Sequence, residues 1–329
     1  MPSAALYSSF KLPGFFWGPV RPPTSRPRSR VSRSGFPKKE RALATGLFNS
    51  GTNIGAVVGT SLVAWLTLRW SWRAAFVFTG SLGFVWLIAW PLLYRAPERH
   101  PWLRQEEFDY ITGEEASAQG AGQSRLSWRE ILLYRQAWGF ILAKFLTDPI
   151  WWFYIFWLPS YLEQGRGYTL KQIEMFAWIP FFAASFGGTL GGWLSGLWMK
   201  RGWSVNRARK TALLVMAVLM PAGIVAALAP TAWAALALIS LAMAAHQGWS
   251  ANVFTLASDV FSKKDVGSIV GLGGAAGALG GMIIAPVAGY TLQFTHSYTP
   301  LFIIAGVMHP LAIGVIHWLI PKVEPVAGA

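Results

Sequence analysis

The stretch GSIVGLGGAAGALGGMIIAPVAGYTLQ, residues 267–293, decides the fold of this chain. It carries no charged residue over 27 positions, and about 20 apolar residues are enough for an α-helix to cross the hydrocarbon core of a membrane. Gly273, Gly277 and Gly281 recur every four residues within it, a spacing that lets helix backbones approach closely in lipid. The stretch therefore predicts a transmembrane helix with closely packed neighbours.

Comparable apolar stretches recur from residue 43 to the end of the chain. The 329 residues are 53% hydrophobic and 13% charged, whereas about 25% of the residues of a soluble domain are charged. We therefore predict an all-α, polytopic membrane protein, a helical bundle of about eight transmembrane helices. The predicted spans are 43–66, 72–94, 138–161, 173–199, 211–230, 232–257, 267–293 and 299–320.

The formal net charge of +14 is distributed unevenly among the predicted connectors. Connectors on one side of the membrane hold 17 Lys and Arg residues, against 4 on the other side. Because basic residues collect in cytoplasmic loops, we predict that both termini and the central loop are cytoplasmic. The lipid bilayer thus accounts for the charge, and no nucleic acid partner is needed.

The chain contains no cysteine and only five scattered histidines. This excludes thiol catalysis and cysteine metal sites, and the histidines lack the spacing of a metalloprotease motif. We predict no cofactor, no metal site and no enzymatic activity.

A five-residue pattern occurs twice, as FPKKE at 36–40 and as FSKKD at 261–265, and a Gly-Leu pair follows each copy at the same offset of 225 residues. The repetition indicates two related halves, as in transporters built from structural repeats. The alternative is that the two lysine pairs merely anchor helix ends among lipid headgroups. Four apolar spans lie between the central loop and the second copy, but only 35 residues, without such a span, precede the first.

We therefore expect a chain that lacks the start of its first half. Residues 37–94 would be the last two helices of an N-terminal bundle, 95–136 a cytoplasmic central loop, 137–321 a complete six-helix C-terminal bundle and 322–329 a cytoplasmic tail. Residues 1–36 are rich in Arg, Pro and Ser; we interpret them as disordered and as an out-of-frame or misassigned start. Residues 125–138 are expected to form an amphipathic helix on the membrane surface, or part of a solvated linker.

Lys144 and Asp148 are charged residues inside the third predicted span. They are four residues apart and share one helix face with Trp151, and charges within a span are costly and often functional. One interpretation is a cavity-lining pair that contacts a polar solute or moves during gating. The other is a self-neutralising ion pair that fixes helix packing.

The sixth predicted span carries His246, Gln247, Trp249, Ser250 and Asn252. Hydrogen-bonding groups beside an indole suit a hydroxyl-rich solute such as a sugar, whereas a buried histidine is more often a packing residue.

Asn49 and Asn53 of the first span either face the same cavity or bond across helices. No role is assigned to His309 or His317. Two further glycine stripes predict close helix contacts, which either slide or pack rigidly; they are Gly51, Gly55 and Gly59, and Gly188, Gly192 and Gly196.

Four segments together resemble the major facilitator superfamily, and within it the anion:cation symporter family, which includes hexuronate and other sugar-acid transporters. They are FPKKERALATGLFNSG at 36–51, KFLTDPIWWF at 144–153, RGWSVNRARK at 201–210 and HQGWSAN at 246–252. The resemblance spans about 36–321 and implies twelve helices in two six-helix bundles, of which helices 5–12 are present and helices 1–4 are missing.

The resemblance implies a secondary active transporter that takes up an organic anion, such as a hexuronate or related sugar acid, together with a proton by alternating access. The substrate-binding or coupling candidates are Lys144, Asp148, Trp151, His246, Gln247, Asn252, Asn49 and Asn53. Residues 188–210 resemble a basic gating loop, with candidates Gly192, Gly196, Arg201, Gly202 and Arg209; many members have an acid at the position of Gly196. Since key anion-binding and coupling residues of the family usually lie on the missing helices, we expect this chain alone to be inactive. The alternative function is a non-transporting membrane remnant or interaction protein.

Overall fold

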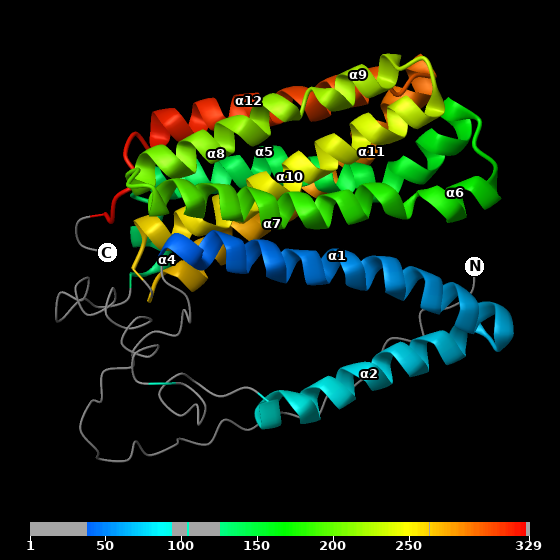
Figure 1. Ribbon diagram of the computed structural model, residues 1–329, viewed down its shortest axis with the longest axis horizontal. Coiled ribbons are helices and arrows are strands. Elements are labelled where there is room, and N and C mark those ends of the chain that lie inside the picture. Colours follow the sequence, from blue (N-terminus) through cyan, green and yellow to red (C-terminus); the bar gives the residue numbers. More distant parts are fainter. Residues whose placement is uncertain (1–37, 94–103, 105–125, 263, 327–329) are drawn as a thin grey trace, which may run out of the picture. The chain divides into compact units, whose positions relative to one another are not determined.

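The computed structural model describes residues 38–93, 104, 126–262 and 264–326, which all belong to one compact unit. These residues form helices and no strand, so the all-α prediction is confirmed (Figure 1). The helices are α1 Lys38–Arg69, α2 Trp72–Leu93, α4 Trp128–Ile131, α5 Arg135–Ser160, α6 Leu170–Phe176, α7 Trp178–Lys200, α8 Val205–Leu219, α9 Ala222–Leu228, α10 Ala232–Val260, α11 Val266–Thr295 and α12 Thr299–Leu319, and a π-helical turn, η2 Tyr161–Gly165, follows α5. The interpretations of residues 1–36 and of most of the central loop fall outside the described residues.

Helices occupy all eight predicted spans, but two of the spans are interrupted. The fourth breaks at Ala177, between α6 and α7, and the fifth breaks at Met220–Pro221, between α8 and α9. Pro180 and Pro221 lack the backbone N–H that would bond to the preceding turn, so both breaks lie where the ladder of hydrogen bonds fails. Within the described ranges, five helical segments are long and apolar enough to cross a membrane: 72–93, 171–200, 205–228, 266–295 and 299–319.

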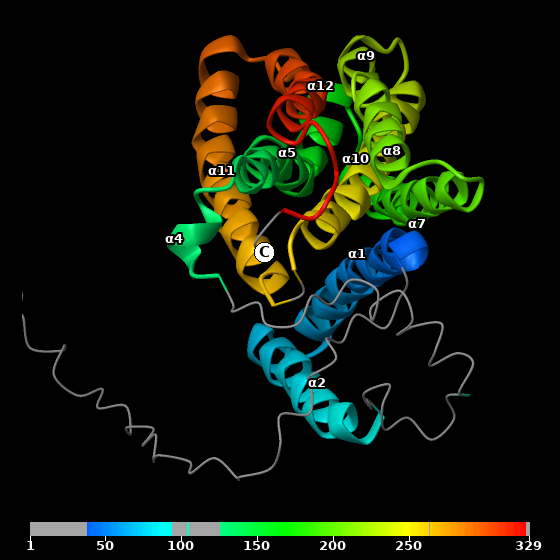
Figure 2. The same cartoon turned by 90° about the vertical axis from the view of Figure 1, so that its left-hand side faces the viewer.

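The interior is built around α5, which packs against α10, α11 and α12 (Figure 2). Phe302 of α12 lies edge-on to Phe153 and to Tyr161, with ring centroids 5.7 Å and 4.8 Å apart. Edge-to-face aromatic pairs of this kind contribute about 0.5–1.5 kcal/mol beyond the area they bury. This cluster holds the Ser160 end of α5 in place, and Lys144 and Asp148 lie in the middle part of the helix.

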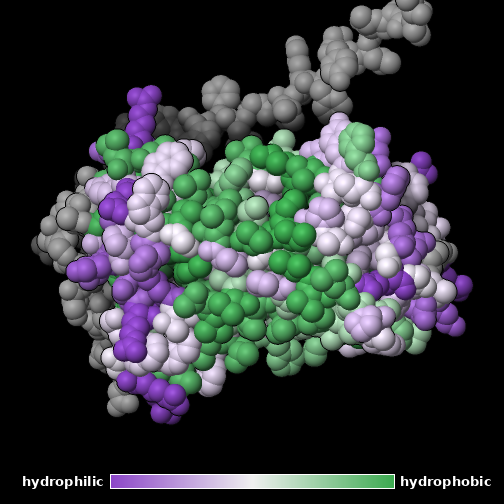
Figure 3. All heavy atoms as spheres, turned by 90° about the horizontal axis from the view of Figure 1, so that it is seen from above, coloured by the Kyte–Doolittle hydropathy of each residue, from purple (hydrophilic) through white to green (hydrophobic). Residues whose placement is uncertain are grey.

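Large apolar side chains also cover the outside of the molecule. Phe76 of α2 is 74% exposed and Leu93 is 73% exposed, and the face in Figure 3 shows a hydrophobic band between hydrophilic ends. In water such a surface would be unfavourable, but in lipid it has no penalty. The outward-facing residues therefore support the prediction of a membrane protein.

Two of the three glycine stripes make the predicted close contacts. A Cβ atom at Gly192 would overlap the backbone of Ala42, and one at Gly46 would overlap the backbone of Gly188, so α7 and α1 meet backbone to backbone. Along α11, Cβ atoms at the three glycines would overlap side chains of α5: Phe140 at Gly273, Asp148 at Gly277 and Trp152 at Gly281.

The prediction is wrong for the stripe on α1. Cβ atoms at Gly51, Gly55 and Gly59 would meet no atom of the described residues within 4 Å. The reason is that α1 meets α7 through the face that carries Ala42, Gly46 and Ser50, and Gly51 points about 100° away from this face.

The acids of the two repeated pentads lie at the basic end of the bundle, which we define by connectors 201–204 and 261–265. Glu40 forms an ion pair with Lys200 of α7, with 3.4 Å between Oε1 and Nζ. The buried Asp265 instead accepts hydrogen bonds from the Leu126 N–H at 2.9 Å and from the Ser262 hydroxyl at 2.5 Å. The acids at the same position of the two pentads therefore bind different parts of the chain: Glu40 binds α7, and Asp265 binds the residues just before α4.

The segment predicted as an amphipathic surface helix contains only one helical turn before α5. Ser127 and Glu130 form a reciprocal capping box at the start of α4, and the Ser127 hydrogen bonds lower the pKa of the Glu130 carboxyl. Ile131 is fully buried and belongs to the hydrophobic core. The apolar residue thus packs into the bundle, and α4 is a capped connector to α5.

Candidate functional site

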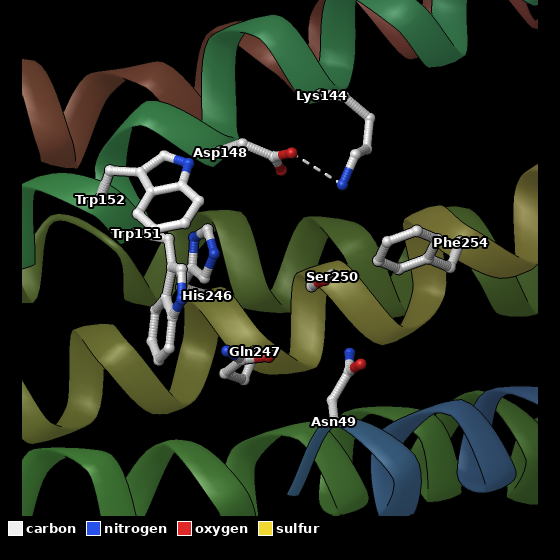
Figure 4. A pocket seen from close by; sticks show the side chains of 9 residues that line it. All are labelled: Asn49, Lys144, Asp148, Trp151, Trp152, His246, Gln247, Ser250 and Phe254. Carbon is white, nitrogen blue, oxygen red and sulfur yellow. Dashed lines mark ion pairs between the residues drawn. The ribbon is translucent and has the colours of Figure 1, made fainter. Parts of the chain in front are cut away.

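A cavity of about 200 Å³ opens between α1, α5 and α10 (Figure 4). It is lined by Asn49 of α1, by Lys144, Asp148, Trp151 and Trp152 of α5, and by His246, Gln247, Ser250 and Phe254 of α10. Six of the eight candidate substrate residues thus lie around one cavity. Trp152 and Phe254 were not predicted, and Ser250 was noted without a role.

Helix periodicity explains why these residues meet. Residues three, four and seven positions apart share a helix face, as do Lys144, Asp148 and Trp151 on α5, and His246, Ser250 and Phe254 on α10. The sequence predicted the shared face on α5, and the structure adds that this face meets α10.

Lys144 and Asp148 form a close ion pair in the cavity wall. Nζ of Lys144 lies 2.8 Å from Oδ2 of Asp148, and the two side chains are 7% and 23% exposed. The ammonium also lies 4.2 Å from the centre of the Phe254 ring, a favourable cation–π contact. Loss of one partner would leave an uncompensated charge at a cost of about 3–5 kcal/mol, so the pair stays together unless another ion replaces one member.

Glycines of α11 make room for the Asp148 turn of α5. Pro149 cannot donate to the carbonyl of Phe145, one turn earlier, yet α5 continues through it as a helix. Cβ atoms at Gly277 and Gly280 would overlap the Asp148 carboxylate and the Phe145 carbonyl, respectively. The α11 stripe is therefore part of the site, because it sets where Asp148 lies.

His246 is held by aromatic neighbours on two sides. The Trp151 ring stacks on its imidazole, with centroids 5.4 Å apart and an interplanar angle of 7°. Its Nδ1 lies 3.1 Å from Nε2 of His309 in α12. No sequence signal connects His246 with His309, because they are 63 residues apart and sit on different helices.

Trp249 lies behind His246 and does not line the cavity. Its ring is 5.2 Å from that of His309, and its Nε1 donates to the Thr147 hydroxyl at 3.2 Å. The indole beside the hydrogen-bonding groups is therefore that of Trp151, and Trp249 is a packing residue.

Asn252, a substrate-binding or coupling candidate from the sequence, does not line this cavity. Its Nδ2 donates to the carbonyls of Gly191 and Gly248, both at 2.9 Å, and it is fully buried between α10 and α7. At about 100° per residue, Asn252 points roughly 60° beyond Trp249, which already faces away from the cavity. The side chain of Asn53 lies outside the part of α1 that the structure describes.

The basic loop motif contains a buried ionic network. Nε of Arg209 in α8 lies 2.9 Å from Oδ2 of Asp259 in α10, and Nη1 donates to the Ser195 hydroxyl of α7 at 2.8 Å. Arg209 therefore joins three helices.

The structure also describes the four other candidates of the basic loop motif. Gly192 contacts α1, Gly196 is buried, Arg201 is exposed, and Gly202 has a φ of 90° in the turn after α7, a backbone conformation that favours glycine. The charged contact between α7 and α1 involves Lys200 and Glu40, not position 196.

Comparison with known proteins places these features in a family. The model of the Major Facilitator Superfamily matches residues 28–250. The chain is 37% identical over 299 residues to a hexuronate transporter of Escherichia coli K12, which covers 90% of this chain and 68% of that protein. It is 39% identical over 194 residues to a galacturonate transporter of Dickeya chrysanthemi, covering 58% of this chain and 56% of that protein.

A D-galactonate transporter of Escherichia coli O6:H1 is 28% identical over 290 residues, covering 86% of this chain and 66% of that protein. These relatives are transporters and not enzymes, in agreement with the prediction from the sequence. The chain is a multi-pass membrane protein that belongs to the major facilitator superfamily.

Proposed function

We propose that this protein is a secondary active transporter for an organic anion, a hexuronate or related sugar acid, and that it couples uptake to a proton by alternating access in a bacterial inner membrane with both termini cytoplasmic. The observation that carries the proposal is the Lys144–Asp148 ion pair, set among neutral hydrogen-bonding groups in one cavity. The names of the hexuronate and galacturonate transporters support the substrate class.

The cavity has complementary groups for each part of a sugar acid. The Lys144 ammonium suits the carboxylate, and the side chains of Asn49, Gln247 and Ser250 can bond hydroxyl groups. The Trp151 ring offers an apolar face to the ring carbons. The volume of about 200 Å³ is below the ~300–1,000 Å³ typical of drug-sized ligands, which favours a monomeric solute.

The ion pair also suggests how a proton is coupled to the anion. A substrate carboxylate that approaches Lys144 becomes a second negative charge beside Asp148. Two carboxylates that share one cation favour the binding of a proton to one of them. Asp148 would therefore accept a proton when the anion binds and lose it when the anion leaves.

Binding and uptake assays with the 329-residue chain test the proposal. Labelled glucuronate and galacturonate are bound to the purified protein by scintillation proximity, and uptake into proteoliposomes is measured with and without an inward proton gradient. Uptake that rises with the gradient supports symport and contradicts the expectation that this chain alone is inactive. Binding without uptake supports the expectation from the sequence that this chain does not transport alone. Absence of both, for hexuronates, aldonates and aldarates alike, contradicts the substrate class and favours the non-transporting alternative.

A further inference from the structure

Phe254 of α10 lies beside the Lys144 ammonium in the wall of the cavity (Figure 4). Nζ of Lys144 is 4.2 Å from the centre of the Phe254 ring, well inside the distance of about 6 Å at which an aromatic face attracts a cation. It is the charged nitrogen that lies over the ring. Phe254 therefore acts on the charge of Lys144 and does more than fill space.

The cavity has two unlike ends. Lys144 and Phe254 lie at one end, and the stacked rings of Trp151 and His246 lie at the other (Figure 4). His246 and Phe254 are eight residues apart on α10, which is about 12 Å at 1.5 Å per residue. Since α10 runs from His246 toward the connector 261–265, the cation lies at the end of the cavity that is nearer the basic end of the bundle.

Asp148 and Phe254 stabilise the ammonium in different ways. The Asp148 carboxylate carries a full charge, which is lost when it takes up a proton and which a second anion can replace at Lys144. The ring of Phe254 attracts the cation through the negative potential of its face. It cannot take up a proton, and it does not compete with a carboxylate as a hydrogen-bond acceptor for the three N–H donors of the ammonium.

Burial makes the contact with the ring important. The Lys144 side chain is only 7% exposed, so its charge depends on neighbouring groups and little on water. Cation–π contacts are also stronger when the cation is desolvated. The ring attraction thus persists when Asp148 is neutralised, and it keeps the long lysine side chain at the same end of the cavity.

We propose that Phe254 is a positioning residue that holds the Lys144 ammonium at the basic end of the cavity, so that an anionic solute binds with its carboxylate there and its uncharged part toward Trp151 and His246. The orientation of the solute rests on the proposed function; the position of the ammonium does not.

The position of the ammonium is tested by magic-angle-spinning NMR on the full chain in lipid bilayers, with isotope-labelled lysine and no solute. The Lys144 signal is the one that disappears in Lys144→Arg, which keeps the charge. We expect the ring current of Phe254 to shift this signal, Phe254→Tyr to keep the shift and Phe254→Leu to lose it. A Lys144 signal that is unchanged in Phe254→Leu would overturn the contact.

The effect of the ring on binding is tested with a trifluorinated phenylalanine at position 254. Fluorine weakens the negative potential of the ring face but changes the shape of the ring little, so a role in packing alone would not respond to it. Glucuronate and galacturonate should bind several-fold more weakly to this protein in a scintillation proximity assay, and on the order of tenfold more weakly to Phe254→Leu. Phe254→Tyr should keep most of the affinity.

The matched control carries the same trifluorinated residue at Phe294, which is exposed near the end of α11 and should leave binding as in the wild type. Equal binding by the wild-type protein and the protein trifluorinated at position 254 would overturn the role of Phe254. If the wild-type protein binds neither acid, the proposed function fails and the solute orientation with it, whereas the NMR result on the ammonium stands.

The orientation of the solute has its own readout. With glucuronate labelled with ¹³C at the carboxyl carbon and with ¹⁵N-labelled lysine and tryptophan, we expect a dipolar contact between that carbon and Nζ of Lys144. A contact with the indole nitrogen of Trp151 in its place would show that the solute binds the other way round and would contradict the proposal.

Discussion

Gly277 of α11 lies directly against the carboxylate of Asp148 in α5, so close that a Cβ atom would overlap Oδ2. The Asp148 carboxylate can lie at this place only because the facing residue of α11, Gly277, has no side chain. This contact links the glycine stripe, which was interpreted as a packing feature, to the polar cavity.

The Gly277→Ala variant tests this link. The added methyl must displace the Asp148 carboxylate and disturb its ion pair with Lys144; overpacking of this kind costs about 1–3 kcal/mol. We expect a lower melting temperature and at least about tenfold weaker binding of sugar acids. Gly274→Ala is the matched control, because a Cβ atom there would meet no atom of the described residues within 4 Å. Equal binding by the two variants would contradict a role of the stripe in the site.

A double-mutant cycle at Lys144 and Asp148 separates the two interpretations of the ion pair. Lys144→Met or Asp148→Leu alone leaves one buried charge and should destabilise the protein by about 3–5 kcal/mol. The double variant should regain most of this stability but should not bind the anion, as measured by thermal unfolding and scintillation proximity. Binding by the double variant at the wild-type level would mean that the pair only fixes helix packing.

The contact between α1 and α7 can be measured by cysteine cross-linking, since the chain has no native cysteine. The hydroxyl oxygens of Ser50 and Thr189 are 3.1 Å apart, so cysteines at these two positions should form a disulfide on mild oxidation. After oxidation we expect fewer free thiols. They are counted by labelling with a maleimide-linked polymer, which raises the apparent mass of the protein for each free thiol.

Gly192→Ala in the same background should slow this cross-linking, because its methyl overlaps the Ala42 backbone and pushes the helices apart. The control is Gly51→Ala, where a Cβ atom meets no described neighbour. An equal cross-linking rate in the Gly192→Ala and Gly51→Ala variants would show that the packing of α1 on α7 does not depend on the close backbone approach at Gly192.

The buried pair of Arg209 and Asp259 should be important for stability. Asp259→Asn leaves the fully buried guanidinium without its counter-charge, which costs about 3–5 kcal/mol. Ser195→Ala removes one hydrogen bond to the same guanidinium and should cost about 1–3 kcal/mol. Thermal unfolding in detergent measures both, with the exposed Arg201→Ala as control. A melting temperature unchanged in Asp259→Asn would exclude this role.

The sequence predicted the helices well because lipid demands long apolar segments with internally bonded backbones. It also predicted which residues share a face, since helix periodicity fixes directions within one helix. Lys144, Asp148 and Trp151 illustrate this, and the structure finds all three in one cavity wall.

Helix periodicity does not specify which neighbouring helix packs against a given helix face. Asn252 was a substrate-binding candidate, but α7 lies on its side of α10 and its side chain donates a hydrogen bond to the Gly191 carbonyl of α7. His309 was left without a role, because its partner His246 is on another helix. Gly51 has the same spacing pattern as Gly192, yet within the described part of the chain only Gly192 has a close neighbour. These outcomes depend on tertiary packing, which a single sequence does not specify.

The hydrogen bond from the Leu126 N–H to Asp265 has a practical consequence for dissecting the molecule. It links the residues just before α4 and α5 to the start of α11. Asp265, which lies in the second half of the chain, thus holds these residues in place. A polypeptide cut before Leu126 would keep its own capped start, and the two pieces, expressed separately, could be tested for reassembly in one membrane.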